Sequence, residues 1–396
     1  MLDSLMIGVI ALVKSALTNE KIPLPEDFSI LEAAKISTKH RIESLIYYGA
    51  VNCGIPKDDP VMKKLFRSVC AALFVSENQL REIERVFLSF EENSIEYMPL
   101  KGLVLKELYP KKDMRSMSDA DVLICVEQYP KIKEIMLSLG FSEKIESDHE
   151  LIWESPLLTL ELHKRLIPSY NEDFFAYFGD GWQLAKKSNE NKTRYEMSKE
   201  DEYIYLLTHF AKHYRDGGVG IKHVADFFVF LQNFSQIDRN YTAVQLDKLH
   251  LSFFEENVMK TLDFWFGNGK EDDRVDLITS VVFNSGAYGT YENHLIAQAT
   301  KESKILGSAK KARRKEYMNL VFMPYSSMCK RYPVLIKAKI LLPVFWFFRG
   351  IEALFNRRKM ISAHYNDVRY KTDDRVSEYK QMLDFVGLSF NFSDDQ

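Results

Sequence analysis

Two carboxylates stand two positions apart at the start of an apolar run, in Ser118-Asp119-Ala120-Asp121-Val122-Leu123-Ile124. The run predicts a β-strand, whose side chains alternate between two faces. Asp119 and Asp121 then point the same way, while the residues after each of them point into the core. Two bare carboxylates repel each other, so a cation between them is expected, and hard oxygen ligands suit Mg²⁺ shared with substrate phosphates. The alternative is a turn or cap formed by Ser118 and Asp119.

A second alternating segment, residues 157–163, predicts another half-buried strand. Thr159, Glu161 and His163 share one of its faces. If this strand lies beside the first, Glu161 becomes a third carboxylate at the same metal centre, placed to accept a proton from an attacking hydroxyl. His163 can orient that carboxylate. Three acidic groups indicate phosphate chemistry more strongly than the first pair alone.

A lysine and a glycine precede the carboxylates, in Pro99-Leu100-Lys101-Gly102. The glycine predicts a turn between a strand at 95–100 and a short helix at 103–109. Lys101 is a candidate for neutralising phosphate charge, with a solvated residue at a strand end as the alternative. Arg115 is a second candidate, and it can equally brace its loop by pairing with an acidic neighbour.

These residues resemble the uncharacterised bacterial nucleotidyltransferases of the polymerase-β-like superfamily. The resemblance rests on the Leu-Lys-Gly of 100–102, the Arg-x-x-x-Asp-x-Asp of 115–121 and the Glu-x-His of 161–163, and it extends over most of the chain. It implies that Asp119, Asp121 and Glu161 are the catalytic, metal-binding carboxylates. Lys101 and Gly102 occupy the turn on the phosphate side.

The sequence departs from the wider superfamily after Gly102, where Leu103 stands in place of the usual Gly or Ser. A Ser hydroxyl that would contact a phosphate is therefore missing, and Lys101 can compensate as a point charge. The departure affects the expected affinity for triphosphate more than the affinity for metal.

The pattern of elements predicts an α+β fold, a small mixed β-sheet nucleotidyltransferase core with N-terminal and C-terminal helical regions. We expect four parts along the chain. They are a helical subdomain at 1–94, the α+β core at 95–198, a helical subdomain at 199–300, and a basic C-terminal helical region at 301–396 with an apolar segment and a frayed tail from residue 376.

Cysteine usage and hydropathy exclude other classes of protein. Cys53, Cys70, Cys125 and Cys329 show no paired spacing, which argues against a disulfide framework or a structural zinc site and favours the cytoplasm. No transmembrane segment is expected, because no stretch reaches the roughly 18 to 20 apolar residues that span a bilayer.

A pair of histidines, His209 and His213, lies four residues apart on a predicted helix. Metal ligation is one interpretation. We favour packing or hydrogen bonding, because the Glu of a zinc protease motif is missing and apolar residues surround the pair.

Positive charge is concentrated near the C-terminus, although the net charge of the chain is only −3. Residues 301–360 contain fifteen Lys or Arg and three acidic residues. Beside the aromatic run 345–348, this charge predicts peripheral contact with a membrane or another polyanion. For the apolar block 340–348 we favour packing under the domain over an interface. Nucleic acid is disfavoured because no recognised binding module accompanies the charge.

Together these features predict a Mg²⁺-dependent nucleotidyltransferase with two metal ions, Mn²⁺ being an alternative ion. It moves a nucleoside monophosphate from a nucleoside triphosphate such as ATP to an unidentified hydroxyl acceptor, which is a sugar, a small molecule or a protein, and it releases pyrophosphate. Two alternatives stay open. One is a non-catalytic nucleotide-binding or scaffold protein linked to cell-surface polysaccharide synthesis, and the other is a phosphotransferase that passes the γ-phosphate.

Overall fold

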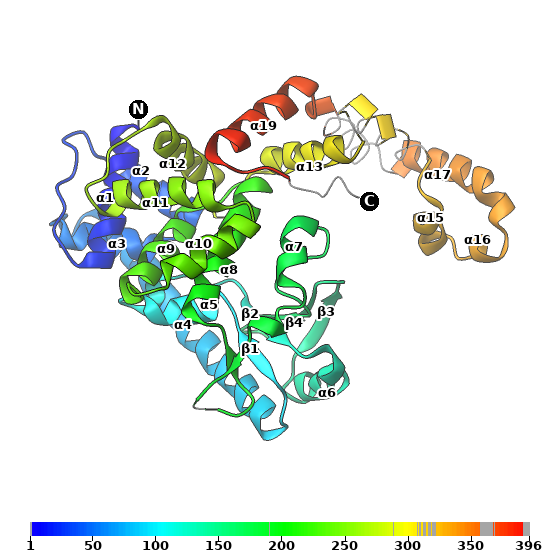
Figure 1. Ribbon diagram of the computed structural model, residues 1–396, viewed down its shortest axis with the longest axis horizontal. Coiled ribbons are helices and arrows are strands. Elements are labelled where there is room, and N and C mark those ends of the chain that lie inside the picture. The colour runs from blue at the N-terminus through cyan, green and yellow to red at the C-terminus, as the bar shows by residue number, and fades with distance from the viewer. Residues whose placement is uncertain are drawn as a thin grey trace. The chain divides into compact units, whose positions relative to one another are not determined.

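The computed structural model describes residues 2–189, 191–287, 289–306, 308, 310–311, 314–315, 318, 322–356, 367 and 369–390. The chain forms two compact units, whose elements are labelled in Figure 1. Unit 1 consists of Met1–Tyr214, Val219–Gly289 and Val386–Gln396, and unit 2 consists of Arg215–Gly218 and Thr290–Phe385.

A five-stranded mixed sheet lies in unit 1 (Figure 1). Its strands are β1 (Tyr97–Pro99), β2 (Ala120–Ile124), β3 (Ser142–Glu146), β4 (Glu150–Glu154) and β5 (Thr159–His163), in the spatial order β1-β2-β5-β4-β3. β2 and β5 are parallel, and every other neighbouring pair is antiparallel. The predicted α+β class with a small mixed sheet is confirmed.

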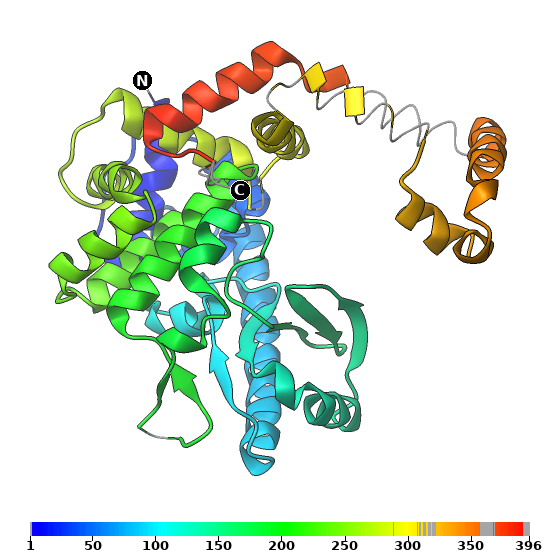
Figure 2. The same cartoon turned by 45° about the vertical axis from the view of Figure 1, so that its right-hand side comes forward.

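One face of the sheet packs against two helices, α4 (Pro60–Glu92) and α6 (Tyr129–Ser138). Figure 2 shows α4 running the length of the sheet. Alternate residues of β2 point toward these helices, and Ala120, Val122 and Ile124 are fully buried there. This arrangement fixes the direction of the side chains between them, so that Asp121 faces away from α4.

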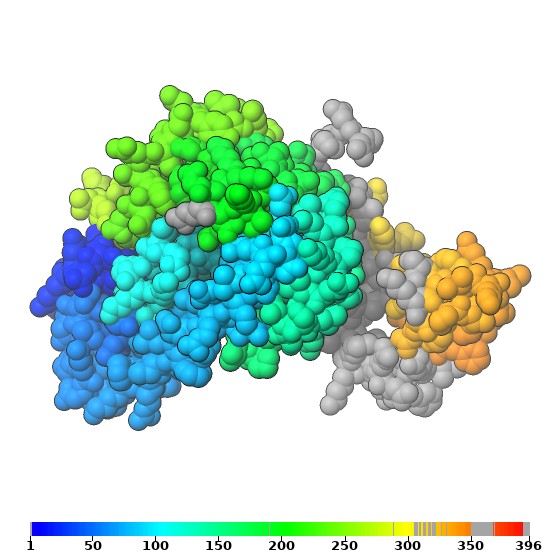
Figure 3. Space-filling model, turned by 90° about the horizontal axis from the view of Figure 1, so that it is seen from below, coloured from blue at the N-terminus to red at the C-terminus, as the bar shows by residue number. Residues whose placement is uncertain are grey.

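Helix α4 begins where the sequence supplies a strong start signal. The carboxylate of Asp59 accepts hydrogen bonds from the backbone amides of Val61 and Met62, and Pro60 occupies the first helical turn. The side of α4 away from the sheet is exposed and appears in light blue in Figure 3. Phe74 on this side is 69% exposed.

Helices make up the rest of unit 1. Before the sheet lie α1 (Ser4–Thr18), α2 (Ile30–His40) and α3 (Glu43–Asn52). Between and after the strands lie α5 (Gly102–Leu108), α7 (Glu172–Phe178), α8 (Lys199–Arg215), α9 (Ile221–Asn233), α10 (Arg239–Lys248), α11 (Ser252–Phe266) and α12 (Asp273–Ser285). Short elements are the 3₁₀ turns Lys112–Met114, Val126–Gln128 and Trp182–Leu184 and the two-stranded ribbon of β6 (Lys186–Lys187) and β7 (Tyr195–Glu196).

Unit 2 contains α13 (Tyr291–Leu306), α15 (Tyr325–Arg331), α16 (Val334–Lys337), the 3₁₀ turn η4 (Lys339–Leu341), α17 (Leu342–Asn356) and most of α19 (Asp373–Val386). The expectation of a frayed tail from residue 376 is wrong for residues 376–390. Val376, Leu383 and Val386 are buried at helical spacing, so α19 is held by packing. Residues 391–396 lie outside the described part of the chain. No described helix combines the length and the hydropathy needed to cross a bilayer.

Candidate active site

Asp121 and Glu161 are register partners on the parallel strands β2 and β5. Residues paired in this way project from the same face of a sheet, so both carboxylates lie on the face away from α4. Asp121 is buried and Glu161 is half-buried. Asp119 directly precedes β2, on the same face by alternation, and its carboxylate accepts a hydrogen bond from the Ser118 hydroxyl at 3.3 Å.

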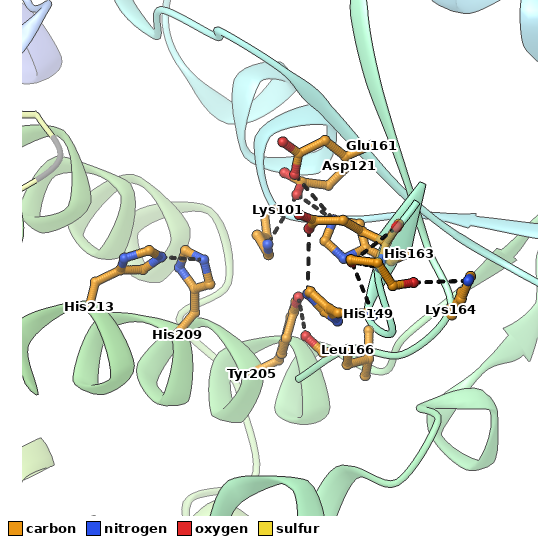
Figure 4. Close-up of polar contacts among 12 residues, drawn as sticks. Lys101, Asp121, His149, Glu161, His163, Lys164, Leu166, Tyr205, His209 and His213 are labelled. Carbon is orange, nitrogen blue, oxygen red and sulfur yellow. Dashed lines mark hydrogen bonds and ion pairs between the residues drawn. The ribbon is translucent and has the colours of Figure 1, made fainter. Parts of the chain in front are cut away.

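Two cationic or polar groups converge on one oxygen of Asp121 (Figure 4). The ammonium of Lys101 donates to Oδ1 at 3.0 Å, and Nε2 of His163 donates to the same oxygen at 2.8 Å. Burial alone would raise the pKa of Asp121, but Lys101 and His163 together hold it well below its usual range. Burial alone would lower the pKa of Lys101, but the negative charge of Asp121 has the larger effect, so the pKa of Lys101 is raised. Asp121 is therefore a buried carboxylate that stays ionised.

Glu161 has the opposite electrostatic environment. Burial, followed by the charges of Asp121, Asp119 and Glu150, raises the pKa of Glu161 to about 8. Nε2 of His163 lies 3.7 Å from Oε2 of Glu161, beyond hydrogen-bond distance. His163 thus orients Asp121 directly, whereas the sequence suggested that it orients Glu161.

Two groups of side chains in the described part of the chain have the composition of a metal site. One is Asp121, Glu161 and His163, whose ligand atoms lie within 4.8 Å of one another, and the other is His149, Glu150 and His163. Asp119 is not in either group, although its charge acts on Glu161. The carboxylate pair suits a hard divalent cation such as Mg²⁺, because two buried or half-buried acids repel each other and one of them resists ionisation.

The turn at Lys101 and Gly102 is shaped by close contacts. Lys101 has φ +39° and ψ −102°, a strained conformation for a residue with a side chain. A Cβ added to Gly102 would lie 3.0 Å from Nη1 of Arg115. The backbone amide of Leu100 donates to the carbonyl of Asp121 at 3.0 Å, which ties the turn to β2. These contacts hold the Lys101 ammonium against the carboxylate.

Arg115 is engaged in a buried ion pair. Its Nε and Nη2 donate to the two oxygens of Asp226 on α9, at 2.8 and 3.0 Å, and Tyr109 donates to the same carboxylate at 2.7 Å. Burial disfavours the charged acid, but Arg115 keeps the pKa of Asp226 below its usual value. The geometry favours Arg115 as a brace of its loop, the second of the two roles that the sequence allowed. Asp226 is therefore a salt-bridge residue.

Further buried contacts hold the loop that leads into Asp119. The ammonium of Lys106 donates to the carbonyl of Arg115 at 2.7 Å, and the amide of Gln79 on α4 donates to the carbonyl of Met117 at 3.1 Å. Lys106 is buried, and burial together with the nearby charge of Arg115 lowers its pKa to about 8. The loop is thus fixed from three directions, which positions Asp119 before β2.

Sequence reasoning missed several residues around the carboxylates. Glu150 is the register partner of His163 on β4, and the His149 ring lies 4.8 Å from that of His163 with an edge-on orientation. The alternation of β4 was the signal that could have found Glu150. Lys222 on α9 is a further case. Burial and, next, the charge of Arg115 lower its pKa to about 8, although acids that include Asp119 act in the opposite direction.

Helix α8 contributes aromatic and imidazole groups next to Lys101 (Figure 4). Tyr205 is buried and donates to the carbonyl of Leu166 at 3.4 Å. Nε2 of His209 lies 3.0 Å from Nε2 of His213, and burial keeps the pKa of both rings well below the usual value. The described metal-type groups do not include them. The preference for packing and hydrogen bonding over metal ligation agrees with this geometry.

No curated protein matches the chain. The solution structure of the antibiotic-resistance factor ANT(2'')-Ia is similar at 12% identity over 46% of this chain and 95% of that chain, with a TM-score of 0.33, too low to support a conclusion. A family model described as "uncharacterised nucleotidyltransferase" matches residues 26–267, which include all the carboxylates described above and α9. The chain therefore belongs to this family of nucleotidyltransferase enzymes.

Proposed function

We propose that the protein transfers a nucleoside monophosphate from a nucleoside triphosphate to a hydroxyl acceptor, with Mg²⁺ as the cofactor and pyrophosphate as the second product. The observation that carries the proposal is the pairing of Asp121 with Glu161 on neighbouring parallel strands. Asp119 precedes the first strand, and the Lys101 ammonium lies at the same carboxylate. Family membership supports nucleotidyl transfer as the reaction class.

Asp119, Asp121 and Glu161 are the residues that would hold the metal. The raised pKa of Glu161 reflects burial and an excess of nearby negative charge, which a divalent cation would offset. When bound, a pair of Mg²⁺ or Mn²⁺ ions supplies charge stabilisation at the entering and leaving oxygens of an in-line displacement.

Lys101 has a separate role in the proposal. Its ammonium is held at Asp121 by a strained turn, and it is a point charge that can move from the carboxylate to an oxygen of the triphosphate. Stabilising charge that develops on phosphoryl oxygens is the main task of such a group. Leu103 follows Gly102 where a Ser could have contacted a phosphate. The Lys101 ammonium would supply the phosphate contact that this Ser hydroxyl would have made.

The reaction balances as a single displacement. The acceptor oxygen forms a bond to the α-phosphorus, the bond from that phosphorus to the bridging oxygen breaks, and pyrophosphate leaves with the electron pair. Glu161 accepts the proton of the acceptor hydroxyl.

The acceptor is a sugar, a small molecule or a protein hydroxyl, and ATP is one donor in the proposal. A cytoplasmic location, where triphosphates and Mg²⁺ are available, is part of it. A bacterial source follows from the resemblance of the sequence motifs and from nothing in the geometry.

The test uses two labels. The protein is incubated with Mg²⁺, a cell extract and triphosphates that carry the label on the α- or the γ-phosphate. We expect the α-label in an acceptor and the γ-label in pyrophosphate. Transfer of the γ-label to the acceptor, with release of a diphosphate, would show a phosphotransferase instead. Absence of transfer from every triphosphate, together with unchanged melting temperature on adding triphosphate and Mg²⁺, would favour a scaffold.

A further inference from the structure

Residues 322–349 of unit 2, here called the α15–α17 segment, form their own small packing unit (orange in Figure 1). Met328 and Leu335 are fully buried. The Trp346 indole donates to the carbonyl of Met323 at 2.9 Å, and the Tyr325 hydroxyl donates to the carbonyl of Leu335 at 2.9 Å. These buried side chains and hydrogen bonds define an inner side of the segment.

The opposite side of α16, η4 and α17 carries large apolar side chains that the segment does not bury. Ile336 and Phe347 are each 68% exposed, and Ile340 is 88% exposed. Val344 and Phe348 are exposed as well. Ile336 belongs to α16, Ile340 to η4, and Val344 and Phe347 to α17, so three consecutive elements each expose large apolar side chains. The preference for packing of block 340–348 is wrong for its side chains Ile340, Val344, Phe347 and Phe348.

Basic residues accompany this apolar side in the sequence. The sequence from 322 to 349 contains five basic residues and no Asp or Glu. The basic residues are Lys330, Arg331, Lys337, Lys339 and Arg349. Lys337 and Lys339 are exposed and lie in the chain between Ile336 and Ile340. Lysines can extend toward a charged surface while the neighbouring apolar groups enter a less polar layer.

We propose that the exposed side of the α15–α17 segment binds the surface of a bilayer that contains anionic lipid. Apolar side chains enter the boundary between headgroups and acyl chains, and the lysines contact lipid phosphates. The segment lies on the bilayer without crossing it, since no described helix is long and apolar enough to span one. The proposal does not depend on the nucleotidyl-transfer chemistry.

Two other occupants fit the surface less well. A second copy of the chain would place the same set of positive charges against itself, which is repulsive. A nucleic acid would contact the lysines, but it would leave Ile340 and Phe347 exposed to water. Both remain outcomes of the experiment.

The experiment is flotation of the full chain with phosphatidylcholine vesicles, with and without phosphatidylglycerol. We expect binding only where phosphatidylglycerol is present. Replacing both exposed apolar residues in Ile340→Ser/Phe347→Ser should lower binding at least about tenfold. Neutralising both lysines in Lys337→Gln/Lys339→Gln should lower it about 30-fold, because each lysine near an anionic surface contributes about fivefold.

The matched control is Phe74→Ser on α4, which removes a Phe of similar exposure that has Glu77 close by in the sequence. This variant should bind vesicles as the unchanged protein does. Melting temperature checks the fold of every variant. Transfer activity in solution should be the same in every variant as in the unchanged protein. Three outcomes overturn the proposal: equal flotation of the Ile340→Ser/Phe347→Ser variant, no binding to anionic vesicles together with binding to RNA, or no vesicle binding together with a dimer that this variant dissociates.

Discussion

Lys101 and Asp121 form a largely buried ion pair, with the ammonium nitrogen 3.0 Å from Oδ1 of the carboxylate. The pair joins the Lys-Gly turn to the strand that bears the metal-type carboxylates. Under the proposed function, Lys101 and a divalent cation at Asp121 would compete for this carboxylate, and a bound triphosphate would offer the ammonium another partner.

The Lys101→Met variant tests this competition. We expect tighter binding of Mn²⁺, used as a spectroscopic substitute for Mg²⁺, because Oδ1 of Asp121 loses its competing cation. Turnover should nevertheless fall by about 10²-fold, since a charge that stabilises the phosphoryl oxygens is lost. Mn²⁺ titration and labelled-nucleotide transfer measure the two effects separately. A variant with weaker Mn²⁺ binding would contradict the competition.

The raised pKa of Glu161 gives a prediction for stability. Between about pH 4.5 and pH 8 the folded state keeps a proton that the unfolded chain releases. The free energy of unfolding therefore falls as the pH rises through this window. The Glu161→Gln variant removes the ionisation, so it should be more stable than the unchanged protein at pH 8 without metal and similar to it below pH 4.5.

Urea denaturation at several pH values, with a chelator present, checks the Glu161 prediction. Glu154→Gln is the matched control, because Glu154 is an exposed acid at the end of β4, the strand next to that of Glu161. This control should show no such pH-dependent gain. A constant difference between Glu161→Gln and the unchanged protein across the pH range would contradict the electrostatic account.

The Arg115–Asp226 pair predicts a large effect on the fold. Removing one partner, in Arg115→Met or Asp226→Leu, leaves a buried charge without compensation and should cost about 3–5 kcal/mol of the free energy of unfolding. The double variant should recover most of that loss, because both charges are then absent. If Arg115→Met instead weakens only triphosphate binding and leaves stability unchanged, Arg115 contacts phosphate as the sequence first suggested.

The sequence alone was sufficient for the local geometry of the carboxylates. Alternation along a strand predicts the shared face of Asp119 and Asp121, and separately that of Glu161 and His163. The strands expected at 95–100 and 157–163 correspond to β1 and β5 to within a few residues at each end. Local patterns could not show that β5 pairs in parallel with β2 while β3 and β4 extend the sheet beyond it, because strand order depends on packing between distant segments.

Long-range partners were equally beyond the sequence. Arg115 meets Asp226 from a helix far along the chain, and His149 reaches His163 through the antiparallel pairing of β4 with β5. The wrong expectation of a frayed tail has a related cause. The expectation rested on nearness to the C-terminus, whereas eight of the residues 376–390 are apolar, and Val376, Leu383 and Val386 among them are buried at helical spacing.

Binding of Mn²⁺ tests the central claim most directly, namely that Asp119, Asp121 and Glu161 together hold the divalent cation. Electron paramagnetic resonance follows the loss of free Mn²⁺ signal as protein is added, with a non-hydrolysable triphosphate present. The Asp119→Asn/Asp121→Asn variant should bind Mn²⁺ at least about tenfold more weakly than the unchanged protein. The Glu154→Gln control should bind it normally. Equal Mn²⁺ binding by the folded double variant would contradict the account.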